Sequence, residues 1–181
     1  MISPLIRKFG LTVHVGFSVG WFGSVLAFLA LAMYGATGGN VPTVRAVYVS
    51  MNLIGWWIIV PLSFAALLTG IIQSLISPWG LFRYYWVVIK LMITIAATAL
   101  LLLHMQPVGH LASVVAARTL EHGELAGIRL QLAADAGAAL VALLVALILS
   151  VYKPQGLTAY GRRKKRENSR RGTVPASNQT G

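Results

Sequence analysis

Four ionisable side chains lie inside long apolar stretches of this sequence: His14, Lys90, His104 and Asp135. A charged group at the middle of a membrane helix costs about 2.5–3.5 kcal/mol on insertion scales, so each of these residues needs a partner or a function. A histidine and a carboxylate can share a proton, or they can bind a metal ion together. These residues are therefore the first candidates for a functional site.

Their depths along the expected helices, at about 1.5 Å per residue, separate the polar residues into two layers. The layer on the side expected to face outward contains Asn52, His104 and Asp135. We expect His104 and Asp135 to form a pair that binds a metal ion or relays protons, with His110 as a third metal ligand. The alternative is a hydrogen bond between helices that only fixes their packing. The sequence leaves the cofactor open, with a metal ion as the candidate.

The layer on the opposite, inner side contains His14, Thr69 and Gln73, with Lys90 somewhat deeper. In a functional interpretation His14 is a ligand or a proton acceptor beside Gln73 and Lys90. In the structural interpretation His14 is a hydrogen-bonded polar residue near the membrane interface, and Lys90 extends its ammonium group to the cytoplasmic lipid headgroups. The sequence leaves both interpretations open.

Residue patterns typical of enzymes are absent from the sequence. It has no nucleotide-binding loop and no HExxH spacing, and without cysteine it has no thiolate metal site, disulfide or thiol nucleophile. Haem ligation by two histidines requires both at one depth, and only His104 and His110 share a side, with Pro107 between them. We expect no catalytic residues, and a haem or quinone redox subunit is the least supported alternative.

Four apolar stretches are long enough to carry these residues through a bilayer, which takes about 20 apolar residues per helix. The expected spans are residues 10–34, 48–76, 83–105 and 126–152. Short turns between them predict an all-α fold, a four-helix transmembrane bundle within residues 1–153. Pro61 predicts a kink in the second span. Pro107 is expected to start a loop that reaches about Leu125 and contains a short interfacial helix.

Helical periodicity indicates which edge of each span faces the bundle. In the third span the edge with Lys90 and His104 is polar and the opposite edge is apolar. In the fourth span Asp135 shares its edge with alanines, which let a neighbouring helix come close, and leucines occupy the other edge. The first span is ambiguous because His14 lies opposite the small edge of Gly16 and its neighbours. One edge packs in the bundle, and the other is free for a dimer contact.

An alternative for the first span is a cleaved signal peptide, since Ala30-Leu31-Ala32 has a suitable small-x-small pattern. Its apolar region would be about 20 residues long, which exceeds the usual 7–15. We therefore expect a membrane span.

Basic residues are concentrated outside the spans. The chain is 57% hydrophobic and 10% charged, far less charged than a soluble domain. Eight of its 15 Lys and Arg residues lie from Lys153 onward. Residues 154–181 should form a disordered basic tail that contacts anionic lipid. This placement argues against nucleic acid as a partner, despite the net charge of +11. The excess of basic residues beside both termini predicts a multi-pass membrane protein with cytoplasmic termini.

The chain contains a series of short motifs: a histidine before Gly-Trp-x-Gly, then Leu-Thr-Gly, then Trp-Gly-Leu-Phe and a lysine within the membrane. The residues concerned are His14, Trp21, Gly23, Thr69, Gly70, Gly80 and Lys90. This pattern resembles a family of bacterial four-helix integral membrane proteins of unknown function, which also share the VYKPQGLTAYG stretch. It is similar, more distantly, to the membrane domain of CopD-type copper-resistance proteins. The resemblance implies the fold and the membrane location, which would be the bacterial inner membrane. A copper role would come only from the distant relatives, and this chain has no Met-rich or Cys-containing copper motif.

Two functional hypotheses follow from these residues. In the first, the protein is a small module that handles a metal ion or protons at His104 and Asp135. In the second, it is a non-catalytic accessory or assembly subunit whose small-residue edges bind another membrane protein or a second copy of the chain. In both cases the lipid bilayer is its immediate partner.

Overall fold

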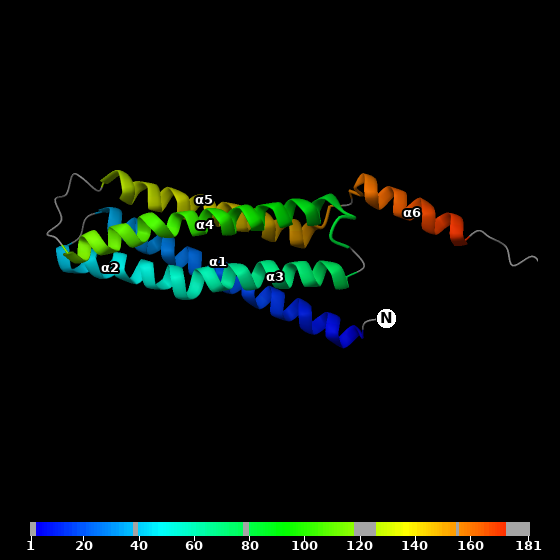
Figure 1. Ribbon diagram of the computed structural model, residues 1–181, viewed down its shortest axis with the longest axis horizontal. Coiled ribbons are helices and arrows are strands. Elements are labelled where there is room, and N and C mark those ends of the chain that lie inside the picture. The colour runs from blue at the N-terminus through cyan, green and yellow to red at the C-terminus, as the bar shows by residue number, and fades with distance from the viewer. Residues whose placement is uncertain (1–2, 38–39, 78–79, 118–125, 155, 173–181) are drawn as a thin grey trace, which may run out of the picture.

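The protein is a bundle of long helices in the computed structural model, which describes residues 3–37, 40–77, 80–117, 126–154 and 156–172 (Figure 1). In chain order the elements are α1 (Pro4–Thr37), α2 (Val41–Ile54), the π-helical turn η1 (Gly55–Ile59), α3 (Val60–Ile76), α4 (Tyr85–Ala117), α5 (Ala126–Tyr152) and α6 (Ala159–Gly172). Because α2, η1 and α3 follow without a break, they form one continuous rod. The predicted all-α four-helix bundle is confirmed.

Four helical rods are long and apolar enough to cross a membrane: Pro4–Thr37, Val41–Ile76, Tyr85–Ser113 and Gly127–Tyr152. Each contains the core of one predicted span, and the first three extend beyond the predicted limits. The chain is accordingly an integral membrane protein.

The rods are arranged in a ring. The α1 helix packs against the α2–α3 rod and against α5, and α4 packs against the same two neighbours. Rods that are successive in sequence are therefore adjacent in space, which is the predicted up-down order. The N-terminus and α6 lie at one end of the bundle, called the tail end below; the end of α1 and the start of α2 lie at the opposite, loop end (Figure 1).

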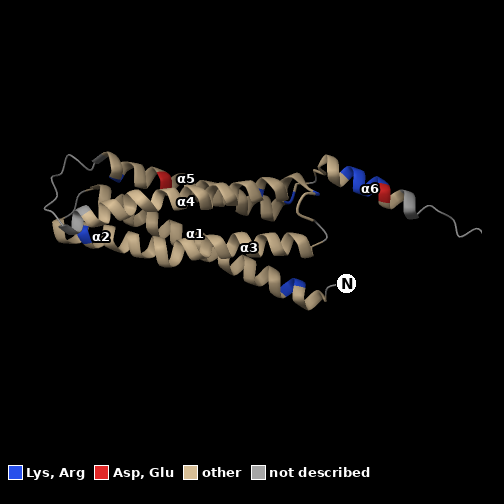
Figure 2. Ribbon diagram, in the orientation of Figure 1, with Lys and Arg blue, Asp and Glu red and all other residues tan. Residues whose placement is uncertain are grey.

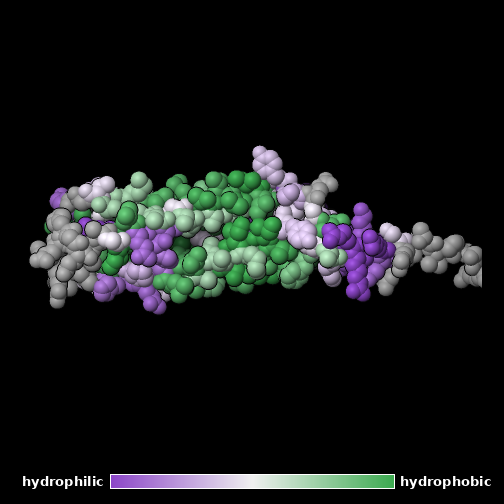
Figure 3. Space-filling view, turned by 90° about the horizontal axis from the view of Figure 1, so that it is seen from above, coloured by the Kyte–Doolittle hydropathy of each residue, from purple (hydrophilic) through white to green (hydrophobic). Residues whose placement is uncertain are grey.

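Two clusters of buried side chains hold the rods together. At the loop end, Tyr48 and Met51 of α2 pack with Leu111 of α4. In the middle, Trp21 of α1 packs with Ile59 of η1. Large apolar side chains also cover the outside, and Figure 3 shows a hydrophobic surface over the middle of the bundle with hydrophilic surface towards its ends. A surface of this kind is suited to lipid.

The sequence predicts a kink at Pro61, and the structure shows a π-helical turn, η1, immediately before this region of the rod. In a regular α-helix the proline ring would clash with the carbonyl four residues earlier. Here the Val60 N–H donates to the carbonyl of Gly55, five residues earlier, which widens the turn. Gly55 also allows α4 to approach, because a Cβ atom at this position would lie 2.5 Å from Cε of Met105.

The end of the third span differs from the prediction. The sequence predicts a loop after Pro107, but α4 continues through Pro107 to Ala117. Val108 and Leu111 are only 2% and 0% exposed, and they pack into the loop-end cluster. This burial favours continued helix and offsets the cost of the proline, which leaves the carbonyl of Leu103 without its helical hydrogen bond and crowds it with the ring.

The tail also differs from the prediction. The sequence predicts disorder throughout residues 154–181, whereas residues 159–172 form α6. The Thr158 hydroxyl caps this helix by accepting a hydrogen bond from the Gly161 N–H at 3.1 Å. Arg163 and Glu167, four residues apart, form an ion pair on its exposed surface. The remaining residues of the tail, 173–181, lie outside the described part of the chain.

A backbone clamp attaches the start of the tail to the bundle. The Tyr85 N–H donates to the carbonyl of Gly156, and the Thr158 N–H donates to the carbonyl of Arg83, at 3.0 and 3.1 Å. Gly161 permits this approach, since a Cβ atom there would lie 2.3 Å from the Arg83 carbonyl oxygen. The α6 helix therefore starts from a fixed position beside α4.

Basic residues gather at the tail end. Figure 2 shows Lys and Arg along the first turns of α1 and along α6, whereas the middle of the bundle is almost uncharged. Arg7 and Lys8 of α1 and Lys153 after α5 belong to this group. The bundle therefore has an apolar middle and a concentration of basic residues at its tail end.

Candidate functional site

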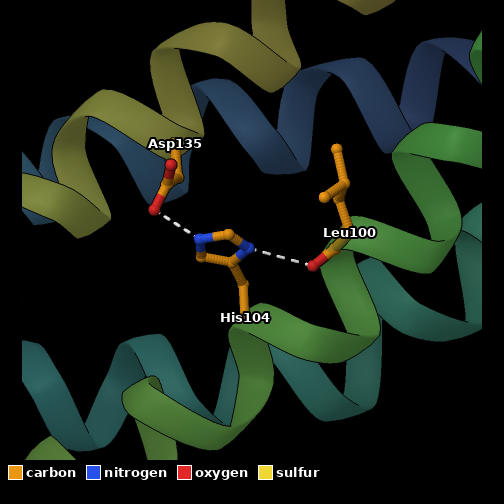
Figure 4. A network of polar contacts seen from close by, with 3 residues as sticks. All are labelled: Leu100, His104 and Asp135. Atoms are coloured by element: carbon orange, nitrogen blue, oxygen red, sulfur yellow. Dashed lines mark hydrogen bonds and ion pairs between the residues drawn. The ribbon is translucent and has the colours of Figure 1, made fainter.

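The predicted pair of His104 and Asp135 forms between α4 and α5 (Figure 4). The Nε2 atom of His104 contacts the Oδ2 atom of Asp135 in a short hydrogen-bonded ion pair. The Nδ1 atom of the same ring lies 3.0 Å from the carbonyl oxygen of Leu100, one turn earlier on α4. The ring is thus held at both nitrogens, by its own helix and by the neighbouring one.

These two contacts determine how many protons the pair holds. A carbonyl oxygen can only accept, so Nδ1 of His104 must carry a hydrogen and donate it to Leu100. A carboxylate oxygen next to Nε2 requires a second proton between the two atoms, on the ring or on Asp135. In both arrangements the pair as a whole is neutral, which is the inexpensive state inside a membrane.

The pair borders an apolar cavity of about 320 Å³ between α1, α4 and α5. Aromatic side chains, Trp21 and Phe28, line one side, and alanines of α5 line another. The small alanines leave this space open because they do not fill the gap between the helices. The side chains of His104 and Asp135 are 27% and 35% exposed, and both line the cavity.

The other residues predicted for this layer do not join the pair. His110 lies on the continued α4 helix and is exposed, and within the described residues no three His, Cys, Asp or Glu side chains form a metal-binding group. The role of His110 as a third ligand therefore stays a prediction; with no loop after Pro107, His110 lies on α4, about 120° around the helix from His104. Asn52 approaches Gly109, at 3.6 Å from its Cβ position, and its buried oxygen has no hydrogen-bond partner among the described residues.

A second polar group forms at the tail end, as the inner layer predicts. Nδ1 of His14 lies 3.1 Å from the hydroxyl oxygen of Thr69. Nε2 of His14 lies 3.3 Å from Nζ of Lys90. The oxygen of Gln73 is close by, 2.9 Å from the Cβ position of Gly10, which permits this approach of α1 and α3. Three helices thus contribute to one polar group around His14.

The direction of these hydrogen bonds follows from Thr69. Its hydroxyl donates to the carbonyl of Ala65 at 2.6 Å, so its oxygen accepts the Nδ1 hydrogen of His14. Nε2 of His14 is then the acceptor for the Lys90 ammonium group, which has only hydrogens to give. His14 is therefore a neutral ring beside a cation, and this group carries a net positive charge.

The His14 group lines a cleft of about 400 Å³ at the tail end. Arg7, Lys8 and Lys153 line the same cleft, together with the buried side of α4. The cleft is therefore basic, while the cavity beside His104 is apolar. The depth of these residues could be predicted from the sequence, but the cleft that joins them could not.

The structure resolves the ambiguity of the first span. His14, Trp21 and Val25 form the buried edge of α1. Gly16 and Gly23 are exposed, with no atom within 4 Å of their Cβ positions. The small edge therefore faces outward, and its predicted contact with a second protein stays a prediction.

One buried cation was missed by sequence reasoning. Arg129 of α5 is only 6% exposed, and its guanidinium carbon lies 5.8 Å from the centre of the Tyr48 ring. The spacing of Arg129 from Leu132 and Ala136, both buried, follows the helical period and could have indicated an inward position.

The fold and these sites define an integral membrane protein, a four-helix bundle with one polar pair in each half. Comparisons of the chain with protein-family models, with curated proteins and with solved structures found no match. The resemblance to four-helix bacterial membrane proteins therefore stays a prediction. Only the geometry of the two polar sites supports a function for this protein.

Proposed function

We propose that the protein is a non-enzymatic membrane module that takes up and releases a proton at the His104–Asp135 pair. The observation that carries this proposal is the contact of both ring nitrogens with acceptor oxygens, which requires a proton between Nε2 and the carboxylate. Removing that proton would leave a net negative charge beside an apolar cavity, so its release needs a coupled event such as the arrival of a cation or an acceptor group.

A metal ion at the same pair is the second form of this proposal. Nε2 and Oδ2 are suitable ligand atoms, and a metal ion would replace the shared proton. It would need further ligands, and the described residues offer no third His, Cys, Asp or Glu nearby. A haem held by His104 and His110 is less favoured, because these residues lie on one continuous helix, about 120° apart around its axis.

Infrared difference spectroscopy of the protein in lipid bilayers tests the proton proposal. Between acid and alkaline pH, the wild type should show a carboxyl C=O band together with histidine ring bands. The part of the carboxyl band that comes from Asp135 should be lost in Asp135→Asn and shift in His104→Gln. His110→Gln is the matched control, since this exposed histidine lies on the same helix and outside the pair. An unchanged carboxyl band in Asp135→Asn would contradict the proposal.

Metal analysis of the same preparations separates the two forms. A metal ion that copurifies with the wild type and is lost from both Asp135→Asn and His104→Gln would assign the pair to metal binding. If the pair handles protons alone, the metal content should be the same in all variants.

A second candidate function is an accessory or assembly subunit, and the exposed glycines of α1 favour it. Small residues on a lipid-facing edge let a partner helix approach closely. Cross-linking in membranes should capture a second copy or another membrane protein, and Gly16→Leu or Gly23→Leu should prevent the capture. Identical cross-linking of wild type and variants would contradict this candidate.

We further propose that both termini face the cytoplasm of a bacterial inner membrane. Support comes from the concentration of basic residues at the tail end, since positive charge favours the cytoplasmic side. Reporter fusions after Gly181 and within residues 38–40 should report cytoplasmic and periplasmic locations respectively. A periplasmic signal after Gly181 would reverse the orientation.

A further inference from the structure

The Lys90 side chain carries a charge with no acidic partner in the described part of the chain. One of its three N–H donors is used by His14, which is neutral. The described acidic residues are Asp135 and Glu167, and each pairs elsewhere, with His104 and Arg163. A positive charge within a membrane helix needs a compensating group, so an anion is the missing component of this cleft.

The cleft around Lys90 has the lining that an anionic amphiphile requires. Its basic rim is formed by Arg7, Lys8 and Lys153. Arg7 precedes His14 by seven residues on α1, so the cleft extends about 10 Å from the rim into the bundle. Leucines such as Leu11 and Leu91 line its walls and contribute apolar surface. Positive charge at the rim and at depth, with apolar walls, fits a charged headgroup attached to an acyl chain.

We propose that this cleft binds the phosphoryl group of an anionic phospholipid, with Lys90 as the principal contact and Arg7 and Lys8 at the rim. The apolar walls favour a lipid over free phosphate, which shares the same phosphoryl chemistry. The site is separate from the basic helix α6: it lies among the membrane helices, and its ligand is one lipid held in a defined place. It is also independent of the His104–Asp135 pair, which lies in the other half of the bundle.

Native mass spectrometry of the full chain, released from detergent micelles, tests this site. The probes are phosphatidylglycerol, phosphatidylcholine with the same acyl chains, and inorganic phosphate. The wild type should retain one phosphatidylglycerol more firmly than phosphatidylcholine. Lys90→Met should weaken that binding about tenfold, the loss expected for one charge-assisted hydrogen bond. Lys90→Arg keeps the charge and should retain the lipid.

A matched control separates the cleft from the tail. Replacing the five basic residues from Arg162 to Arg166 by Gln removes more charge than Lys90→Met, yet it should leave the firmly held lipid in place. Circular dichroism of each variant checks that the bundle is folded.

Three results would overturn the proposal. The first is equal retention of phosphatidylglycerol by wild type and a folded Lys90→Met. The second is equal retention of phosphatidylcholine and phosphatidylglycerol. The third is displacement of the lipid by millimolar phosphate, which would assign the cleft to a soluble anion.

Discussion

The two halves of the bundle each contain one histidine bound by a charged neighbour, and the sign of that neighbour is opposite. At the loop end His104 contacts a carboxylate, so the pair contains a shared proton and is neutral. At the tail end His14 contacts an ammonium group, so its ring accepts a hydrogen bond and the charge stays on Lys90. The same side chain therefore shares a proton with a carboxylate at one end and accepts a hydrogen bond from an ammonium group at the other.

The surroundings of the two histidines also differ in charge. The cavity beside His104 is lined almost entirely by apolar groups, where a neutral pair is stable and a lone charge is costly. The cleft beside His14 has three further cations at its rim, where an anion is attracted. The comparison shows that the chemistry of a membrane histidine is set by its partner and its environment rather than by its depth.

The largest loss of stability is expected from breaking the His104–Asp135 pair at the loop end. His104→Ala leaves the Asp135 carboxyl without its partner beside an apolar cavity, which should destabilise the bundle by about 1–3 kcal/mol. His104→Gln can keep a hydrogen bond to Asp135 and should restore part of that loss. Unfolding of both variants in detergent measures the difference. Equal stability of His104→Ala and the wild type would show that the pair does not hold the helices together.

A smaller loss of stability is expected from breaking the hydrogen bond between His14 and Thr69 at the tail end. Thr69→Val removes the acceptor for Nδ1 of His14 with little change in shape, a loss of about 0.5–1.5 kcal/mol for one hydrogen bond. The cleft is open, so water can replace part of the lost contact. Nitrogen NMR of labelled histidine should show the Nδ1–H form of His14 in the wild type. Finding the Nε2–H form there would contradict the direction assigned to the Lys90 contact.

The smallest effect on stability is expected from the basic helix. Replacing Arg162 to Arg166 by Gln should leave the melting temperature of the bundle unchanged, because these side chains are exposed. The substitution should still weaken attachment to vesicles that contain anionic lipid, by at most about 1 kcal/mol per residue. Flotation assays measure this attachment. A variant that no longer folds would show that α6 supports the bundle.

The fold and both polar layers could be predicted because their signals are local. Helical period and span length place His14 and Lys90 at one depth, and His104 and Asp135 at another. The continuation of α4 through Pro107 could not be predicted, since it depends on the burial of Val108 and Leu111 against another helix. The clamp at Gly161 likewise depends on a backbone more than 70 residues away in sequence.

Contacts across the bundle decided the remaining features of the sites. Whether Lys90 meets lipid headgroups or His14 depends on the rotation of α1, which its two competing edges left open. Arg129 was missed because a basic residue near a loop usually reaches water, and only the assembled bundle brings this side chain of α5 to Tyr48 of α2. Sequence period fixes the position of a residue along its own helix, and the partners come from the assembled bundle.

The π-helical turn η1 makes the α2–α3 rod sensitive to its length in residues. Met51 precedes this turn in the chain and Ser63 follows it, and both side chains are 0% exposed. In a regular α-helix their spacing would place them about 120° apart, and the one additional residue of a π turn reduces this to about 20°. Deleting a single residue between positions 55 and 59 would leave the two side chains eleven residues apart, about 20° in a regular α-helix, so both halves of the rod would still face the bundle. The rod should therefore tolerate the loss of one residue in η1, whereas an added residue would turn one half by about 100° towards lipid.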